Sequence, residues 1–158
     1  MKDNNSQLNK FKPSSPYFEF QQFPFYWLIR TGAAYSLRME KSLRKNNLNS
    51  TAWRILLILR EMGNLSVTEL AAHAVAKTPT ITRATYKMKT EGFLDIYTSP
   101  HDGRVSIVEI TPKGRESIDM VIENSQKLFV NIYEDFTAEQ IELLNQTLKK
   151  LFVNLQEA

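Results

Sequence analysis

The chain has 158 residues, of which 42% are hydrophobic, and this composition is typical of a globular protein. It contains no cysteine, which excludes thiolate catalysis, cysteine-ligated zinc and thiol-based redox sensing within the chain. The densest apolar run, Ile55–Leu59, is far shorter than the ~20 residues of a membrane-spanning helix. Residues 1–15 lack the apolar core of a secretory signal, so we expect a cytoplasmic protein with no membrane partner.

Charge is distributed unevenly along the chain, although 20 Lys and Arg against 17 Asp and Glu give a net charge of only +3. Residues 1–115 hold 17 basic and nine acidic side chains, a net charge of +8. Residues 116–158 hold three basic and eight acidic side chains, a net charge of −5. The basic segment is suited to a polyanion such as nucleic acid, the alternative being two differently solvated faces of a helical protein.

The first half of the chain predicts an arm and two helices. Residues 1–22 are rich in Asn, Ser and Pro and predict a loose or extended arm. Apolar residues at helical spacing then predict a long amphipathic helix from about residue 25 to 46 or 47. A second helix, capped by Asn49 or Ser50, should run to Met62 and be buried on most sides.

Two shorter helices follow. Ser66 and Glu69 have the spacing of a capping box, which predicts a short helix. Thr78 can cap the next helix with Pro79 at its first position, and this helix should end near Glu91.

The remaining elements are a hairpin and two helices. Residues 93–98 and 104–110 predict strands joined through an Asp-Gly tip at 102–103. A long helix begins at Pro112, and a second capping box predicts a final helix over about 137–156. The fold class is therefore mainly α (α+β).

Two short helices followed at once by a hairpin are typical of a winged helix-turn-helix. The residues of this region also resemble the MarR family of bacterial transcription regulators. The resemblance is carried by Ser66–Leu70, Thr80–Arg83, Gly92–Leu94, Asp102-Gly103-Arg104 and Ile110-Thr111-Pro112-Lys113-Gly114. Its most specific part is the Asp-x-Arg tip placed shortly before the aliphatic-Thr-x-x-Gly start of a helix. We expect a winged DNA-binding domain at 48–111, dimerisation helices at 23–47 and 112–158, and an arm at 1–22.

A helix in the major groove needs short hydrogen-bonding side chains for base edges and long cations for phosphates. The expected DNA contacts of the second short helix are Thr78, Thr80, Thr82, Arg83, Tyr86, Lys87 and Lys89. The helix before it should add Ser66 and Thr68. Arg104 at the hairpin tip is suited to a minor groove, with Asp102 fixing the arginine or the turn. The alternatives are a solvated helix face and a plain Asp-Gly turn.

The resemblance also implies a homodimer bound to double-stranded DNA. More apolar surface lies on the terminal helices than the winged domain can cover, and two-fold DNA readers space their recognition helices about one duplex turn apart. The interface candidates are Phe18, Phe20, Phe23, Phe25, Phe129, Tyr133, Phe136, Leu148, Leu151 and Phe152. Any one of these residues could instead belong to the core of a single chain.

MarR-like regulators commonly bind small aromatic anions and then lose affinity for DNA. Aromatic and cationic residues on the first two helices are suited to such a ligand, because an aromatic acid needs a flat apolar slot and an arginine. The candidates are Tyr26, Trp27, Arg30, Arg38, Trp53 and Arg54. The two tryptophans could instead be core residues.

Sequence motifs for catalysis are absent. The chain has no glycine-rich phosphate loop and no nucleophile or metalloprotease motif, and its histidines are His73 and His101. We therefore expect no catalytic residue, no metal and no cofactor. The resemblance implies a ligand-responsive regulator, with a repressor expected, that binds a near-palindromic operator and is released by a small aromatic anionic effector. The alternative is a winged-helix protein-interaction or anti-repressor module without sequence-specific DNA binding.

Overall fold

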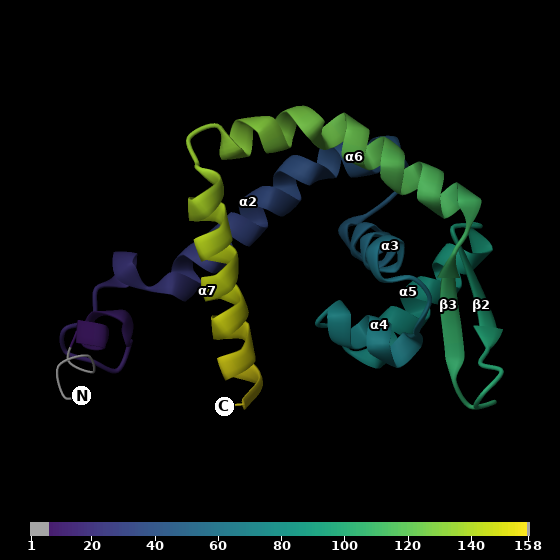
Figure 1. Ribbon diagram of the computed structural model, residues 1–158, viewed down its shortest axis with the longest axis horizontal. Coiled ribbons are helices and arrows are strands. Elements are labelled where there is room, and N and C mark those ends of the chain that lie inside the picture. Colours follow the sequence, from purple (N-terminus) through teal and green to yellow (C-terminus); the bar gives the residue numbers. More distant parts are fainter. Residues whose placement is uncertain (1–6, 158) are drawn as a thin grey trace. The chain divides into compact units, whose positions relative to one another are not determined.

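The computed structural model describes residues 7–157, and Figure 1 shows the order of its elements. The 3-10 helices η1 (Leu8–Phe11) and η2 (Phe20–Gln22) precede α2 (Pro24–Lys45), α3 (Ser50–Met62), β1 (Leu65–Ser66), α4 (Val67–His73) and α5 (Thr78–Thr90). The remaining elements are β2 (Leu94–Thr98), β3 (Ser106–Ile110), α6 (Pro112–Tyr133) and α7 (Ala138–Glu157). The predicted order of long helices and the hairpin is confirmed, and the class is mainly α with a small antiparallel sheet.

The backbone of residues 7–22 is not extended throughout, and residues 1–6 lie outside the described part. Two 3-10 turns form there, and the Glu19 N–H donates to the Lys10 carbonyl at 2.9 Å. Aromatic rings contact one another along the segment, with Phe18 and Phe23 edge to face at 5.7 Å between ring centroids. Contacts among these rings organise a segment whose Pro and Ser content suggested none.

Helix starts follow the capping chemistry, with one difference. The Asn49 side chain accepts from the Ala52 N–H at 2.9 Å, which decides between the two expected caps of α3. The predicted capping box of α4 is present in both directions between Ser66 and Glu69. Helix α5 begins one residue earlier than expected, because Lys77 is its N-cap and makes no side-chain cap bond.

The sheet contains a strand that the sequence did not reveal. Its order is β1-β3-β2, with all neighbours antiparallel. Strand β1 is only two residues long and pairs Leu65 with Val108, so its periodicity was too short to detect. Strand β3 begins at Ser106, which corrects the expected start at Arg104.

The chain divides between Val121 and Ile122 into two compact units. The core of the first unit contains large fully buried side chains from α2, α3, α4, α5, the hairpin and α6: Met39, Ile55, Leu56, Leu59, Leu70, Ile81, Leu94, Val108 and Ile118. The apolar run of α3 is only partly buried as expected, because Leu57 and Ile58 keep intermediate exposure. In residues 7–157 no helix is long and apolar enough to cross a membrane.

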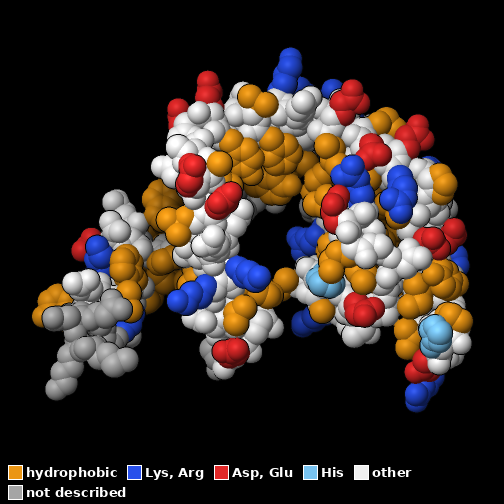
Figure 2. Space-filling view, viewed as in Figure 1, with side chains coloured by type: hydrophobic (Ala, Val, Ile, Leu, Met, Phe, Trp, Pro, Cys, Tyr) orange, Lys and Arg blue, Asp and Glu red, His pale blue; other side chains and the backbone are white. Residues whose placement is uncertain are grey.

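The second unit consists of the end of α6 and all of α7. The expected capping box is confirmed, since the Gln140 side chain accepts from the Thr137 N–H and the Gln140 N–H donates to the Thr137 hydroxyl. No residue of α7 is buried, and Figure 2 shows hydrophobic side chains at the surface of this helix. Phe129 and Tyr133 stack at 6.4 Å, while the exposed candidates of this unit are Tyr133, Phe136 and Phe152.

The end of α5 is joined closely to the start of α6. The Gly92 N–H donates to the Lys89 carbonyl and the Phe93 N–H to the Met88 carbonyl, each at 2.9 Å. This is a Schellman termination, and Gly92 provides its left-handed residue at φ +82°. The Thr111 hydroxyl donates to the Gly92 carbonyl at 2.8 Å. The end of one helix therefore determines where the other begins.

Gly114 makes this close approach possible. A Cβ at this position would stand 2.3 Å from the Phe93 carbonyl oxygen, a distance that side chains essentially never reach. The Gly114 N–H also donates to the Thr111 hydroxyl at 3.1 Å. The Thr-x-x-Gly motif is therefore a structural requirement of the join between α5 and α6.

Replacement of Gly114 by alanine should destabilise the protein, because the added Cβ would collide with backbone and not with a movable side chain. Overpacking typically costs about 1–3 kcal/mol, and we expect the free energy of unfolding to fall by at least 2 kcal/mol, roughly the middle of that range. Urea unfolding followed by circular dichroism measures the change.

Gly32→Ala is the matched control, because Gly32 is also helical and an added Cβ would meet nothing within 4 Å. This substitution should stabilise α2 by about 0.5–1 kcal/mol through the higher helix propensity of alanine. Similar unfolding curves for the two variants would contradict the close approach at Gly114.

Candidate nucleic-acid interface

Helix α5 presents a polar and basic outer face. Its residues Ile81, Thr85 and Met88 are buried, which leaves the opposite side to solvent. The expected DNA contacts on α5 all remain accessible: Thr78, Thr80, Arg83, Tyr86, Lys87 and Lys89 are exposed, and Thr82 is half-buried. The amphipathic pattern of the sequence therefore placed this face correctly.

Only some of these side chains are unengaged. Within residues 7–157 Arg83 has no hydrogen-bond or ion-pair partner, and its guanidinium is free to meet a base or a phosphate. Lys87 lies 3.8 Å from the Glu91 carboxylate, one turn further along. The Lys89 ammonium donates to the Ile96 carbonyl of β2 at 3.0 Å. Lys89 thus holds α5 to the hairpin, a role that helical periodicity did not reveal.

The hydroxyl groups near α5 are also partly engaged. The Thr82 hydroxyl donates to the Thr78 carbonyl at 2.9 Å but keeps lone pairs to accept from a ligand. The Ser66 hydroxyl donates to the Glu69 carboxylate at 2.7 Å as part of the capping box. This bond is the main cause that lowers the pKa of Glu69. Thr68, beside it on α4, is exposed.

Two hollows flank the outer face of α5. The first, of about 340 Å³, is bounded by Arg83 and Lys87 on α5 and by Asn49 and Thr51 at the start of α3. The second, of about 210 Å³, lies on the other flank. Its lining residues are Ser66, Val67, Thr68, Thr82, Tyr86, Arg104, Val105 and Ser106. The outer face of α5 is therefore a ridge with a depression along each side.

Several lining residues were not expected from the sequence. Asn49, Thr51 and Ser106 belong to other elements and reach the hollows only through the packing of α3 and β3. The polar run at the start of α3 was the available signal, but it was interpreted as helix capping alone.

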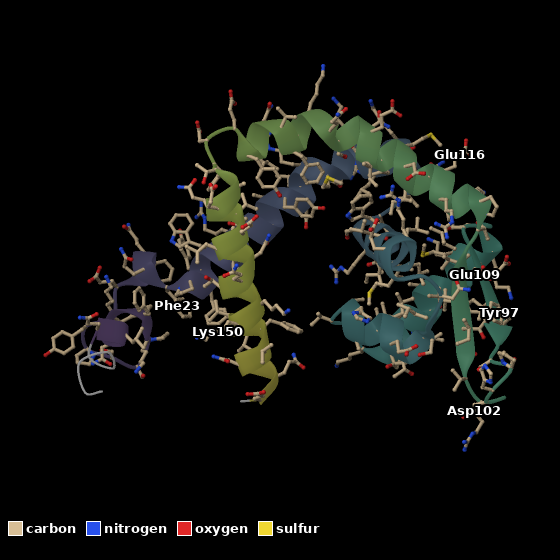
Figure 3. The ribbon with its side chains drawn as sticks, viewed as in Figure 1. Phe23, Tyr97, Asp102, Glu109, Glu116 and Lys150 are labelled. Carbon is tan, nitrogen blue, oxygen red and sulfur yellow. The ribbon has the colours of Figure 1, made fainter. Side chains whose placement is uncertain are left out.

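The wing is a seven-residue loop and not a tight turn. The Ser99 N–H donates to the Val105 carbonyl at 2.8 Å, and the Val105 N–H donates to the Asp102 carbonyl at 2.9 Å. Among residues 7–157 the glycines with positive φ are Gly63 and Gly92, so Gly103 does not form the left-handed Asp-Gly turn considered as the alternative. Figure 3 shows Asp102 at the free end of the hairpin.

Asp102 was expected to fix either Arg104 or the turn, and in the structure it bonds to Arg104. The Asp102 Oδ1 accepts from the Arg104 backbone N–H at 3.0 Å and from its Nε at 3.2 Å. These hydrogen bonds lower the pKa of the Asp102 carboxyl, the side-chain bond being the larger cause. The Arg104 side chain is nevertheless 91% exposed. The arginine is thus oriented by its neighbour while its guanidinium stays accessible to a groove.

The expected ligand residues fall into two groups. Arg30 lies over the Tyr26 ring at 5.3 Å and over the Trp27 ring at 6.0 Å, and it donates to the Tyr26 hydroxyl at 2.9 Å. Trp27 is half-exposed, which does not fit the core alternative, and Arg38 is exposed. Tyr26, Trp27 and Arg30 lie in the first two turns of α2, and Arg38 lies about two turns further along.

The second group lies on α3. Trp53 is buried, as the core alternative required, and its Nε1 donates to the Tyr35 hydroxyl at 3.3 Å. The Arg54 Nη1 donates to the Ala74 carbonyl at 2.9 Å. Tyr35 is nine residues from Tyr26, about 14 Å along a helix axis, so the candidates do not converge on one slot. In the described chain no cluster of three or more acidic or histidine side chains could hold a metal ion.

Two short helices, a basic outer face on the second and a wing define a winged helix-turn-helix DNA-binding domain. Residues 48–106 match the model of the MarR family. The transcriptional repressor IacR of Pseudomonas putida is 41% identical over 144 residues, covering 91% of this chain and 86% of that protein. The chain belongs to the MarR family and is a transcriptional regulator, not an enzyme.

Solved structures share the fold. A MarR-family regulator from Silicibacter pomeroyi aligns with a TM-score of 0.77 at 22% identity, covering 86% of this chain and 92% of that chain. NadR in complex with 4-hydroxyphenylacetate aligns with a TM-score of 0.76 at 22% identity, covering 89% of this chain and 97% of that chain. At this identity the alignments support the winged-helix architecture alone.

The pKa of Asp102 should lie below the ordinary aspartate value and should return toward it in Arg104→Ala, because the arginine bonds favour the ionised carboxylate. A lowered pKa means that the bonds are intact above the ordinary value and are lost as the pH falls through the lowered one. Carbon-detected NMR titration of the carboxyl measures both values. Arg83→Ala should leave the Asp102 pKa unchanged, and an unshifted Asp102 in the parent protein would contradict the wing geometry.

Proposed function

We propose that this protein is a repressor that binds a near-palindromic operator as a homodimer and is released by a small aromatic acid. In this proposal α5 enters the major groove and the wing reaches the adjacent minor groove. The observation that carries it is the polar and basic outer face of α5, where an unpaired Arg83 lines one of the two hollows that flank the helix. The name of the relative IacR, a transcriptional repressor, supports the direction of regulation.

The arrangement of ridge and hollows fits a DNA duplex. A helix in the major groove has a sugar-phosphate backbone along each side, and most contacts to DNA go to those backbones. The hydroxyl and amide groups of Asn49, Thr51, Thr68 and Ser106 lie where such backbones would pass. Thr80 and Arg83 are then the side chains that we propose for base edges, with Arg83 suited to guanine. The other expected contacts, Thr78, Thr82, Tyr86 and Lys87, serve as supporting contacts in this proposal.

The homodimer is supported by apolar surface that a single chain leaves exposed. Leu143 is 64% exposed and Leu155 57%, on a helix with no buried residue. Contiguous exposed apolar surface of this kind marks protein interfaces. We propose that residues 23–47 and 112–158 form the dimer contact, with the aromatic segment around Phe18 and Phe23 adding to it.

The proposed effector is a small aromatic carboxylate. NadR was crystallised with 4-hydroxyphenylacetate, a compound of this class. In this chain Arg30 is held against Tyr26 and Trp27, and a guanidinium bound to aromatic rings retains N–H groups for a carboxylate. We propose Tyr26, Trp27 and Arg30 as the contacts of the effector. Arg38 lies about two turns further along α2, and Trp53 and Arg54 are bonded to the Tyr35 hydroxyl and the Ala74 carbonyl, so these three are left out of the proposal.

The operator proposal is tested by recovering genomic DNA fragments that the purified protein retains at moderate and high salt. We expect one near-palindromic sequence to be enriched. Arg83→Ala should weaken binding to that sequence by about 1–3 kcal/mol through loss of a base contact. Arg115→Ala is the matched control, because it removes one exposed charge outside the α5 face. Uniform, salt-labile retention without a sequence motif would overturn the operator proposal.

The effector proposal is tested by thermal unfolding against a panel of phenols and aromatic acids. A ligand at 100 times its Kd adds about 2.7 kcal/mol to the folded state, which a melting curve resolves. At least one aromatic carboxylate should raise the midpoint, and Arg30→Met should remove that shift. If no compound of the panel moves the midpoint, the effector class is wrong.

A further inference from the structure

Cations from neighbouring helices contact the C-terminal end of α5 and the turn between α4 and α5. At its C-terminal end the Lys113 ammonium of α6 donates to the Glu91 carbonyl at 2.6 Å. Before its N-terminal end the Arg54 guanidinium of α3 donates to the Ala74 carbonyl at 2.9 Å. Neither cation comes from α5 itself.

The Lys113 contact is built by several groups. Glu91 is the C-cap of α5, so its carbonyl belongs to the last turn, whose acceptors lack partners within the helix. The ammonium lies 4.9 Å above the Phe93 ring, and the lysine stem lies 3.7 Å from where a Cβ of Gly92 would be. A cation here also complements the negative end of the helix dipole. The Phe93 ring, the space beside Gly92 and the Glu91 carbonyl together determine the position of the Lys113 side chain.

The Arg54 contact secures a strained turn. Ala74 is the C-cap of α4, and Val75 after it has φ +48°, a left-handed conformation that a β-branched residue rarely adopts. The Val75 N–H donates to the Ala72 carbonyl and the Ala76 N–H donates to the Ala71 carbonyl. These two bonds close the turn that leads from α4 to α5. A strained residue persists only where its surroundings hold it. The Arg54 bond is one of those restraints.

We propose that Lys113 and Arg54 are positioning residues for DNA readout. They fix the two ends of the segment between α4 and α6, so that the outer face of α5 keeps one orientation toward the duplex. Base contacts require correct placement of side chains, whereas general attraction to phosphates tolerates displacement. The two residues therefore contribute to operator preference without contacting DNA. This inference rests on the proposed operator binding.

The test compares Lys113→Met and Arg54→Met with the parent protein on two duplexes of equal length. One is the operator fragment recovered from the genomic selection, and the other has the same composition in scrambled order. Affinity for each is measured by fluorescence anisotropy over a range of salt concentrations, at a temperature well below the thermal midpoint. Arg115→Met is the matched control, because it removes an equal charge two residues from Lys113.

Each variant should lose about tenfold in affinity for the operator and less than about twofold for the scrambled duplex, since only sequence readout needs a fixed helix. The dependence of affinity on salt should not change, whereas losing a phosphate contact lowers its slope by about 0.9. Lys113→Arg should restore operator affinity, because it keeps a donor and a cation near Phe93. Equal losses on both duplexes, or a lower slope, would overturn the inference.

Hydrogen exchange tests, in the absence of DNA, whether the bond from Lys113 to the Glu91 carbonyl restrains the end of α5. In Lys113→Met the amides of the last turn of α5 should exchange several times faster, while those of α3 stay unchanged. Unaltered exchange in that turn would overturn this restraint even if operator binding holds. If the genomic selection fails but hydrogen exchange is altered, the proposed operator binding is contradicted while the restraint of α5 by Lys113 is supported.

Discussion

The close contact between the end of α5 and the start of α6 is the constraint on which the arrangement of the winged domain depends. Gly114 approaches the Phe93 carbonyl so closely that no side chain fits between them. Thr111 then links the Gly92 carbonyl to the Gly114 N–H. Because α6 continues past Val121, the recognition helix is attached to the one helix that both units share. The end of α5 and the first turn of α6 are therefore fixed to one another by these contacts.

The charges of the winged domain serve two different purposes. Lys89, Lys113 and Arg54 donate to backbone carbonyls, and Arg60 pairs with Asp119 of α6 at 3.1 Å. These cations join elements of the domain to one another. Arg83 and Arg104 project from it and supply the contacts proposed for DNA. The net positive charge of the first 115 residues is therefore not a count of DNA contacts, since a substantial part of it is structural.

The two arginines proposed to contact DNA are prepared in different ways. Arg104 is tethered by Asp102, so a carboxylate orients the cation and lowers the cost of ordering it on a groove. Arg83 has no such partner in the described chain and depends on the rigidity of α5 for its placement. In our proposal that rigidity comes from the Lys113 bond at the end of α5 and the Arg54 bond to the turn before α5. Readout by the helix and readout by the wing thus rest on separate local interactions.

Sequence by itself determined the helices, the capping boxes at Ser66 and Thr137, the hairpin and the polar face of α5, because each depends on residues within about a dozen positions. It missed β1, the length of the wing loop and the ordered turns of residues 7–22. Only the tertiary structure decided which polar residues stay accessible and which bond to backbone carbonyls of other elements. Lys89 donates to a carbonyl of β2 and Lys113 to a carbonyl at the end of α5, so each bonds to an element other than its own. Such pairings depend on how helices pack, and hydrophobic periodicity carries no information about them.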